Sequence, residues 1–379
     1  MVEGGHPTTI FVSNFSHYRF QPLRRLPPWQ LWRNELIDGV EFVWIHTPAY
    51  RANDWRRMLN MFAFSGLALI AGLVHRPGPA VVIGVSVHPF AALAGYAVAR
   101  LRGARFFFEE TDLWPQTLID FGRLREGSAM ARLLTRIERF LYRRAERIVM
   151  LWRHTDDHVQ AHGGSPERIL WVPHGVELSR YQSLEPYQGA PQRPFRVMFL
   201  GGFVRSNAVD VMIDAARVLA DRQRDDIRFL LVGSGAEREN LMRRAAELQL
   251  KNVDFPPAVP KAEIARAMNQ ADAFIYGLRD LPLYRFGISL NKLTDYLAAG
   301  RPIIFFGRST YDPVAEARAG FSIPPGDPVA IADAIERLVG LTPQERIQMG
   351  RRGREYLVQH HSIPRLAQRL LDAMEARPA

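Results

Sequence analysis

The chain has 379 residues, of which 47% are hydrophobic and 23% are charged, a composition typical of globular proteins with two or more domains. It contains no cysteine, which excludes structural disulfides, thiolate metal sites and cysteine nucleophiles. The net charge of +10 at pH 7 favours an anionic partner, such as a nucleic acid, an anionic membrane face or a phosphorylated substrate.

The N-terminal segment "MVEGGHPTTIFVSN" has no apolar core after a basic start, so we expect no signal peptide. The longest apolar run, 58–74, has 17 residues, which is at the lower limit for a membrane span. It also contains two glycines, an asparagine and a serine. A buried helix, or a helix that lies on a membrane surface, fits this run better than a span.

The first half of the chain alternates between strand and helix patterns. Short apolar or β-branched runs predict strands, and continuous apolar strands separated by helices predict a parallel sheet covered on both faces. The predicted strands are 8–14, 40–46, 80–86, 105–110, 147–152 and 168–173, and the predicted helices are 88–103 and about 128–146.

Residues 183–194 are rich in proline, glycine and polar residues, which predicts a linker between two domains. The alternation then restarts and predicts a second doubly wound domain. In such domains, ligands bind at the carboxyl ends of the strands, where the strand order reverses. The predicted strands here are 195–202, 228–235, 253–255, 271–276 and 301–306, with helices over 206–222, after 235 and near 342–375.

Two glycine-bearing turns follow the first two strands of the second half. They are Gly201-Gly202 and the segment 233–235, which begins at Gly233. Such turns let backbone amides approach a phosphate at a helix N-terminus. Neither turn is a complete dinucleotide-binding or Walker motif, and a tight turn without a ligand explains each one equally well.

Only three of the 49 basic residues are lysines, and one of them is Lys292. Ser289 is the predicted N-cap of a helix, so Asn291 and Lys292 would lie in the first turn, where an anion is favoured. Lys292 and Asp295 are three residues apart and share a helix face. A cation for phosphate and a carboxylate for ribose suit a nucleoside diphosphate, and the alternative is a surface ion pair.

Acidic residues and histidines also follow predicted strands. Glu109, Glu110 and Asp112 come at the end of one strand, where at least one can act as a general base toward an acceptor hydroxyl. Alternatively, Glu109 or Asp112 caps the next helix. His88 and His174 are candidate donors or general acids, although a structural role is the better interpretation of His88. We recognise no metal-binding motif and no G-x-S-x-G nucleophile turn.

Several segments are similar to those of one enzyme family. "ILWVPHGVELSRY" resembles the segment before the interdomain linker of GT-B glycosyltransferases, and "LVGSGAEREN", "ADAFIY" and "LTDYLAAGRPII" resemble the nucleotide-sugar half of family 4. "GVSVHPFAALAGYAVARLRGARFFFEETDLWPQTLIDFGRL" is similar to a bacterial surface-polysaccharide subgroup with fucosaminyltransferase-type members. "LYRFGISLNKLTDYLAAGRP" is similar to a loop of the xanthan glucuronosyltransferase, and the resemblance covers nearly the whole chain.

The resemblance implies an α/β GT-B fold, with two Rossmann-like doubly wound domains facing across a cleft. The acceptor-side domain would be 1–182, followed by the linker 183–194 and a nucleotide-sugar domain, 195–360. The helix 361–379 would cross back to the first domain. "EGGHPTTIFVSN" resembles the end of the first helix and the second strand of these enzymes, so we expect the first strand and its glycine-rich loop to be missing.

The family also implies how the donor is held. Asp295 matches the second acid of the E-x7-E motif and would bind the ribose, whereas Gly287 replaces the first acid. Lys292 and the amides of 289–291 would bind the diphosphate.

A glycine–arginine phosphate loop would be formed by Gly201, Gly202 and Arg205, although the usual lysine after Arg205 is absent. Asp112 matches the acid on the acceptor side. The expected catalytic residues are therefore Asp112, Glu109 and His174, and the expected donor-binding residues are Gly201, Gly202, Arg205, Gly233, Ser289, Asn291, Lys292 and Asp295.

We therefore expect a metal-independent, retaining glycosyltransferase without a cofactor, although Asp112 would also suit an inverting base. The donor would be a nucleotide diphosphate-sugar, with UDP as the expected nucleotide. The acceptor would be a glycan or polyprenyl-diphosphate-linked glycan in bacterial surface polysaccharide synthesis. We expect a cytoplasmic enzyme that binds the anionic inner face of the inner membrane.

Two alternatives remain at this stage: a UDP-sugar 2-epimerase on the same fold, and a non-catalytic nucleotide-binding partner subunit. A nucleic-acid partner is not expected, because we recognise no binding module and no interleaving of aromatic and basic residues.

Overall fold

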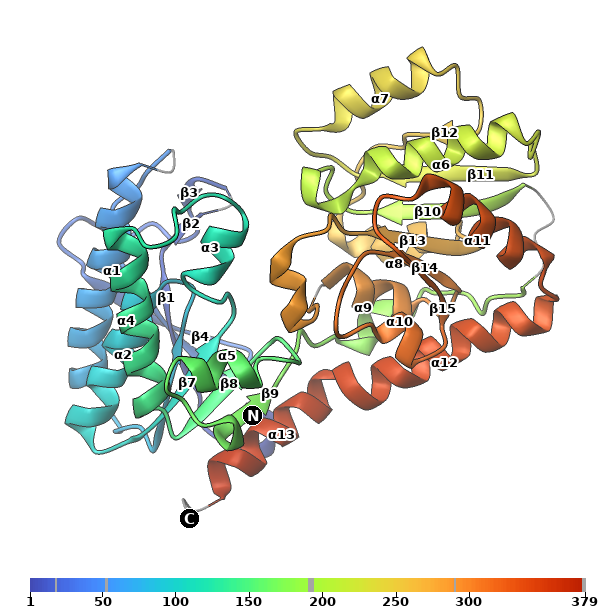
Figure 1. Cartoon of the computed structure of the whole chain (residues 1–379). Helices are drawn as coiled ribbons and strands as arrows, with labels where there is room; N and C mark the ends of the chain where they lie inside the picture. Colours follow the sequence, from blue (N-terminus) through green and yellow to red (C-terminus); the bar gives the residue numbers. More distant parts are fainter. Residues whose placement is uncertain (18, 52–53, 190–193, 290, 377–379) are drawn as a thin grey trace. The chain divides into compact units, whose positions relative to one another are not determined.

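The computed structural model describes residues 1–17, 19–51, 54–189, 194–289 and 291–376 (Figure 1). The chain divides into two compact units. The first contains Met1–Leu151, Thr155–Val172 and Ala367–Ala379, and the second contains Trp152–His154 and Pro173–Leu366. Each unit combines parallel strands with helices, as the sequence predicts.

The first unit has a four-stranded parallel sheet in the order β6-β7-β8-β9 and a three-stranded sheet in the order β1-β5-β4. Two short strands, β2 and β3, pair separately. The strands are β1 (Thr9–Ser13), β2 (Phe15–Ser16), β3 (Gln21–Pro22), β4 (Trp32–Ile37), β5 (Val40–Ile45), β6 (Val81–Val85), β7 (Arg105–Glu110), β8 (Arg147–Met150) and β9 (Ile169–Trp171).

Strand β4 is not among the predicted strands, and the prediction of a purely parallel sheet is wrong for this unit. β4 pairs antiparallel with β5, with Ile37 opposite Val40. The two residues between them, Asp38 and Gly39, have φ values of 49° and 78°. Positive φ at both central residues is what a type I′ hairpin turn requires, and Asp-Gly is a preferred sequence for it.

The predicted helix at 58–74 is present as α1 (Trp55–Val74), but it is only partly buried. Its residue Ala71 packs on Val43 and Ile45 of β5. Away from that contact, Trp55 is 68% exposed and Phe62 is 50% exposed. Among the described residues, α1 is the one helix long and apolar enough to cross a membrane, by length and composition only.

The remaining helical segments of this unit connect or cover the strands. They are η1 (Val2–Gly4), α2 (Pro89–Arg102), α3 (Gln116–Asp120), α4 (Ala129–Arg144), α5 (Asp156–Ala161), η2 (Pro166–Arg168) and most of α13 (Ile363–Glu375).

The second unit has a six-stranded, all-parallel sheet in the order β12-β11-β10-β13-β14-β15. The strand order therefore reverses between β10 and β13, which makes this the expected ligand-binding edge of a doubly wound sheet. The strands are β10 (Phe195–Leu200), β11 (Ile227–Val232), β12 (Val253–Asp254), β13 (Ala273–Gly277), β14 (Ile303–Phe306) and β15 (Gly320–Ile323).

Helices cover both faces of this sheet (Figure 1). Val197 and Phe199 of β10 belong to a buried core with residues of α6 and α11. On the other face, Tyr296 of α9 stacks on Phe274 of β13, with ring centroids 4.5 Å apart. The helical segments are η3 (Leu178–Tyr181), η4 (Arg205–Asn207), α6 (Val209–Asp221), α7 (Arg238–Glu247), η5 (Lys261–Glu263), α8 (Ile264–Met268), η6 (Pro282–Phe286), α9 (Asn291–Ala298), α10 (Pro313–Glu316), α11 (Pro328–Gly340) and α12 (Pro343–His361).

Candidate functional site

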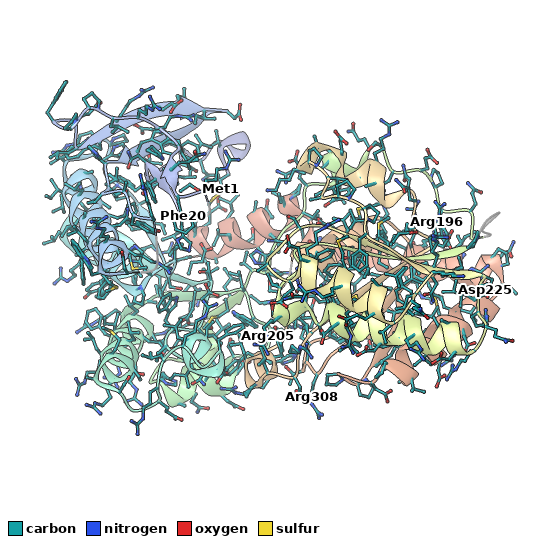
Figure 2. The ribbon with its side chains drawn as sticks, turned by 90° about the horizontal axis from the view of Figure 1, so that it is seen from above. Met1, Phe20, Arg196, Arg205, Asp225 and Arg308 are labelled. Atoms are coloured by element: carbon teal, nitrogen blue, oxygen red, sulfur yellow. The ribbon has the colours of Figure 1, made fainter. Side chains whose placement is uncertain are left out.

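The candidate donor site lies in the second unit, at the carboxyl end of β10. Figure 2 shows Arg205 and Arg308 at one end of this unit and Arg196 and Asp225 at the other. Arg205 and Arg308 follow β10 and β14, whereas Arg196 lies near the start of β10. The loops that carry the predicted site residues therefore gather at the strand ends where ligands bind in this fold.

Three of the predicted residues contact one another at this end of the sheet. A Cβ atom on Gly201 would lie 2.2 Å from Cε of Lys292, so the lysine stem crosses directly over Gly201. A Cβ atom on Gly233, whose φ is +154°, would lie 1.9 Å from the carbonyl oxygen of Gly201. Glycine at 201 and 233 therefore permits the close approach of β10, β11 and the lysine.

The Lys292 ammonium sits between the loop after β10 and the ring of a buried tyrosine. Its Nζ donates a hydrogen bond to Oδ1 of Asn207 (3.2 Å) and lies 5.9 Å from the ring centroid of Tyr276. Asn207 is itself held, because its Nδ2 donates to the carbonyl oxygen of Gly202 (2.6 Å). Burial lowers the pKa of Lys292, and the nearby Asp295 opposes that shift. An ammonium has three N–H donors, so others remain for a ligand.

Asp295 is oriented by a residue that the sequence analysis missed. The hydroxyl of Tyr181, at the end of η3, donates a hydrogen bond to the Asp295 carboxylate. Burial raises the pKa of Asp295, and the bond from Tyr181 and the nearby Arg180, Lys261 and Lys292 oppose this shift. Lys292 and Asp295 thus have different hydrogen-bond partners, and the alternative of a simple surface ion pair between them is wrong.

The predicted N-cap role of Ser289 depends on position 290, which lies outside the described residues, so it stays a prediction. Among the described residues, helix α9 begins at Asn291. The Ser289 hydroxyl accepts a hydrogen bond from the backbone N–H of His174 (3.1 Å). The carbonyl oxygen of His174 accepts one from Nδ1 of His361 (3.1 Å). These contacts fix the backbone of the predicted His174 and place it beside the segment that leads into α9.

Two residues of the predicted phosphate loop, Gly202 and Arg205, are not enclosed by other side chains. A Cβ atom on Gly202 would meet only the carbonyl oxygen of Ser234, at 3.9 Å, so packing does not require glycine there. The side chain of Arg205 is exposed, and its carbonyl oxygen accepts a hydrogen bond from Nε of Arg279 (3.2 Å). The loop then enters α6 through Ala208, whose φ is +47°. This arrangement leaves room for an anion next to Gly202.

The candidate acidic residues of the first unit separate into different environments. Glu110 is buried and accepts a hydrogen bond from the Tyr142 hydroxyl, whereas Asp112 is exposed. Glu109, at the carboxyl end of β7, is half-buried, and this burial raises the pKa of its carboxyl group. Neither Glu109 nor Asp112 caps the next helix, because the N-cap of α3 is Pro115.

The structural interpretation of His88 is confirmed. Its Nδ1 accepts a hydrogen bond from the backbone N–H of Ala91 (3.2 Å), so His88 is the N-cap of α2. Burial lowers the pKa of His88 to about 4, which keeps the ring neutral at neutral pH.

Two further residues position the site, and the sequence analysis missed both. The Tyr296 hydroxyl accepts a hydrogen bond from the backbone N–H of Leu200 (2.8 Å), which ties α9 to the end of β10. Asn207 holds Lys292, as described above. Tyr181 was within reach of sequence reasoning, because it ends the quoted segment "ILWVPHGVELSRY". No spacing in the sequence marks Asn207 or Tyr296.

Two family profiles match the chain, one in each half. Residues 1–175 match "Glycosyl transferase 4-like domain", and residues 194–340 match "Glycosyl transferases group 1". The chain is also similar to the "Probable glycosyltransferase WbjE" of Pseudomonas aeruginosa, with 23% identity over 243 residues. That match covers 61% of this chain and spans 58% of the length of the relative.

Solved structures have a similar fold. Sucrose-phosphate synthase from Thermosynechococcus elongatus matches with a TM-score of 0.71 and 15% identity, over 98% of this chain and 89% of that chain. HepE from Anabaena, in complex with UDP and glucose, matches with a TM-score of 0.64 and 12% identity, over 89% and 87% of the two chains. At these identities the likeness shows the fold, and it confirms the fold class predicted from the sequence.

Proposed function

We propose that the chain is a glycosyltransferase with the GT-B fold that transfers a sugar from a UDP-sugar to a hydroxyl group of a glycan. The main support is the position of Lys292, a half-buried cation at the point where the strand order reverses. The complex of HepE with UDP and glucose supports UDP as the nucleotide.

In this proposal, protein groups alone neutralise the charge of the leaving UDP. Lys292 donates to the diphosphate, and Asn207 holds the ammonium in place. The exposed Arg205 and the N-terminal ends of α6 and α9 add positive potential. Transfer then requires no metal ion at the donor. Asp295, oriented by Tyr181, accepts a hydrogen bond from the ribose hydroxyls.

The acceptor hydroxyl is proposed to lose its proton to an acidic group of the first unit. Glu109 and Asp112 lie at the end of β7 and in the loop after it. The raised pKa of Glu109 moves this group toward the range that suits a general base. We propose retention of the anomeric configuration and an acceptor linked to polyprenyl diphosphate, in surface polysaccharide synthesis. The fucosaminyltransferase-type subgroup remains a prediction.

We also propose that the enzyme is cytoplasmic and binds the inner face of the membrane through α1. Exposed apolar side chains of this helix, such as Leu59 and Phe62, lie near the exposed Arg56. An apolar face beside a cation suits an anionic lipid surface. Co-sedimentation with anionic vesicles should be weakened by Leu59→Ser with Phe62→Ser but not by Leu36→Ser, which removes a more exposed apolar side chain from β4. Equal binding to neutral and anionic vesicles would contradict the proposal.

The proposed activity is tested with radiolabelled UDP-sugars and a mixture of detergent-solubilised lipid-linked glycans. We expect label to move to the lipid fraction with the wild-type chain and with Lys251→Ala, but not with Lys292→Ala. A change of the sugar in UDP-sugar without an acceptor would favour the epimerase alternative. UDP binding without any turnover of the panel would favour the partner-subunit alternative.

A further inference from the structure

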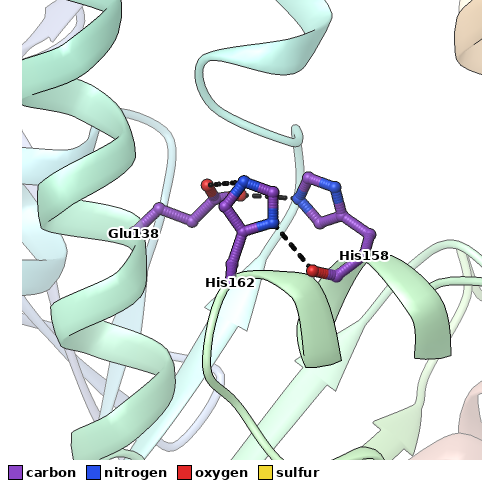
Figure 3. Close-up of side chains that lie close together, drawn as sticks. All are labelled: Glu138, His158 and His162. Atoms are coloured by element: carbon purple, nitrogen blue, oxygen red, sulfur yellow. Dashed lines mark hydrogen bonds and ion pairs between the residues drawn. The ribbon is translucent and has the colours of Figure 1, made fainter.

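The first unit holds a glutamate and two histidines whose side chains converge (Figure 3). Glu138 projects from α4, His158 lies in α5, and His162 follows α5 directly. The two histidines are four residues apart, which puts both rings on the same side of the helical turn. The Glu138 Oε1 atom is 2.7 Å from Nε2 of His158, and Oε2 is 3.6 Å from Nε2 of His162. All three ligand atoms lie within 4.8 Å of one another.

The hydrogen bond of His162 to a backbone carbonyl determines which ring nitrogen carries the hydrogen. The other ring nitrogen has a lone pair and faces Glu138. Its Nδ1 lies 2.8 Å from the carbonyl oxygen of His158, and a carbonyl only accepts, so Nδ1 must carry the hydrogen. In the neutral ring, Nε2 is then unprotonated and faces Oε2 of Glu138. This carboxylate oxygen is buried and accepts no hydrogen bond from any described residue. Nε2 of His162 and Oε2 of Glu138 therefore face each other with their lone pairs, and a cation between them would bind both.

A histidine that donates Nδ1–H to a backbone carbonyl is also oriented in the way that metal ligands usually are. The Glu138 side chain is 2% exposed and that of His158 is 6% exposed, so solvent does little to offset the charge here. The Tyr142 hydroxyl donates to Glu110 and lies 3.3 Å from Oε1 of Glu138. The one hydroxyl hydrogen of Tyr142 is therefore shared between two buried carboxyl groups and does not satisfy Glu138 alone.

We propose that Glu138, His158 and His162 bind a divalent transition-metal ion, with Zn²⁺ as the best match. Two imidazole nitrogens and one carboxylate oxygen are a ligand set that Zn²⁺ accepts and that Mg²⁺ and Ca²⁺ disfavour. The ion fastens α5 to α4 inside the first unit. It is separate from the donor site at Lys292, which lies in the second unit.

The distances need only small changes to fit the ion. Bonds of about 2.0–2.1 Å in a tetrahedron place the ligand atoms about 3.3 Å apart. The distance of 3.6 Å between Oε2 of Glu138 and Nε2 of His162 is close to that value. The distance of 2.7 Å between Oε1 of Glu138 and Nε2 of His158 increases when the ion binds. When the nitrogen–metal bond forms, Nε2 of His158 gives up its proton and Nδ1 carries one, by exchange with solvent, so the ring binds as a neutral imidazole. A water molecule can take the fourth position beside His162, whose side chain is 21% exposed.

The test uses the whole chain after chelation and dialysis, with Co²⁺ as a spectroscopic probe and Zn²⁺ as its competitor. We expect one Co²⁺ per chain with the strong visible absorption of a tetrahedral site, displaced by Zn²⁺. At a metal concentration one hundred times Kd, the melting temperature of the first unit should rise by about 5–10 °C. His162→Gln should weaken binding at least about tenfold, whereas His154→Gln, an exposed histidine, should leave it unchanged.

The proposal is overturned if the wild-type chain gives no tetrahedral Co²⁺ spectrum, whatever the variants do. It is also overturned if His162→Gln, shown to be folded by circular dichroism, binds Co²⁺ as tightly as the wild type. In either case the three side chains form only a buried hydrogen-bonded ion pair. UDP is absent from both measurements, so failure here does not bear on the proposed transfer reaction.

Discussion

Replacing Lys292 with methionine isolates the contribution of its charge. Methionine retains most of the stem that crosses Gly201 but removes the ammonium that bonds Asn207. A hydrogen bond to a charged group contributes about 1.5–3 kcal/mol, so UDP affinity should fall about 10- to 150-fold. Because burial lowers the pKa of Lys292, the charged form is disfavoured in the folded chain, and its removal should not lower the melting temperature.

Isothermal titration with UDP and thermal unfolding measure the two effects on the same samples. The chain offers a matched control, because Lys251 is an exposed lysine far along the sequence, and Lys251→Met should change neither value. UDP affinity within about twofold of the wild type in Lys292→Met would refute the assignment of Lys292 to the diphosphate. Loss of affinity with a collapsed melting temperature would instead mean that the lysine supports the fold.

Three further predictions concern the pH dependence, the close approach of the strands and the acceptor side. UDP affinity should fall as the pH drops through the pKa of Asp295, which is raised. It should also fall as the pH rises through the pKa of Lys292, which is lowered. In titration calorimetry, the Asp295→Asn variant should not show the loss of affinity at low pH. Gly233→Ala should lower the free energy of unfolding in urea by about 1–3 kcal/mol, whereas Gly340→Ala, whose Cβ meets nothing within 4 Å, should not. Asp112→Asn should lower kcat about 10²- to 10⁴-fold and leave UDP affinity unchanged, and near-normal turnover would remove Asp112 from catalysis.

Local sequence patterns were sufficient to predict most strands and the fold class. The apolar residues 106–108 within "RFFFEE" predict β7, because a buried parallel strand needs apolar side chains on both faces. The antiparallel strand β4 was missed although its turn is readable, since Asp38-Gly39 is a strong hairpin signal. The exposed Leu36 in that strand weakened the alternating pattern.

The site was only partly predictable, because its contacts join segments that are distant in sequence. The glycines at 201 and 233 could be identified as turn residues, but only the folded structure shows that the Lys292 side chain crosses Gly201. The convergence of Glu138 with His158 and His162 depends on how α4 and α5 pack, and the sequence shows only the spacing of the histidines. The contact of Ser289 with the backbone N–H of His174 joins residues 115 positions apart, so no local pattern could predict it.

The central claim is that this chain binds and uses a UDP-sugar at the carboxyl end of β10. The most direct measurement is a calorimetric titration of the purified wild-type chain with UDP, a panel of UDP-sugars, ADP and GDP. The account predicts one saturable site per chain for UDP and for at least one UDP-sugar, with ADP and GDP binding more weakly. The absence of binding by UDP and by every UDP-sugar would contradict it.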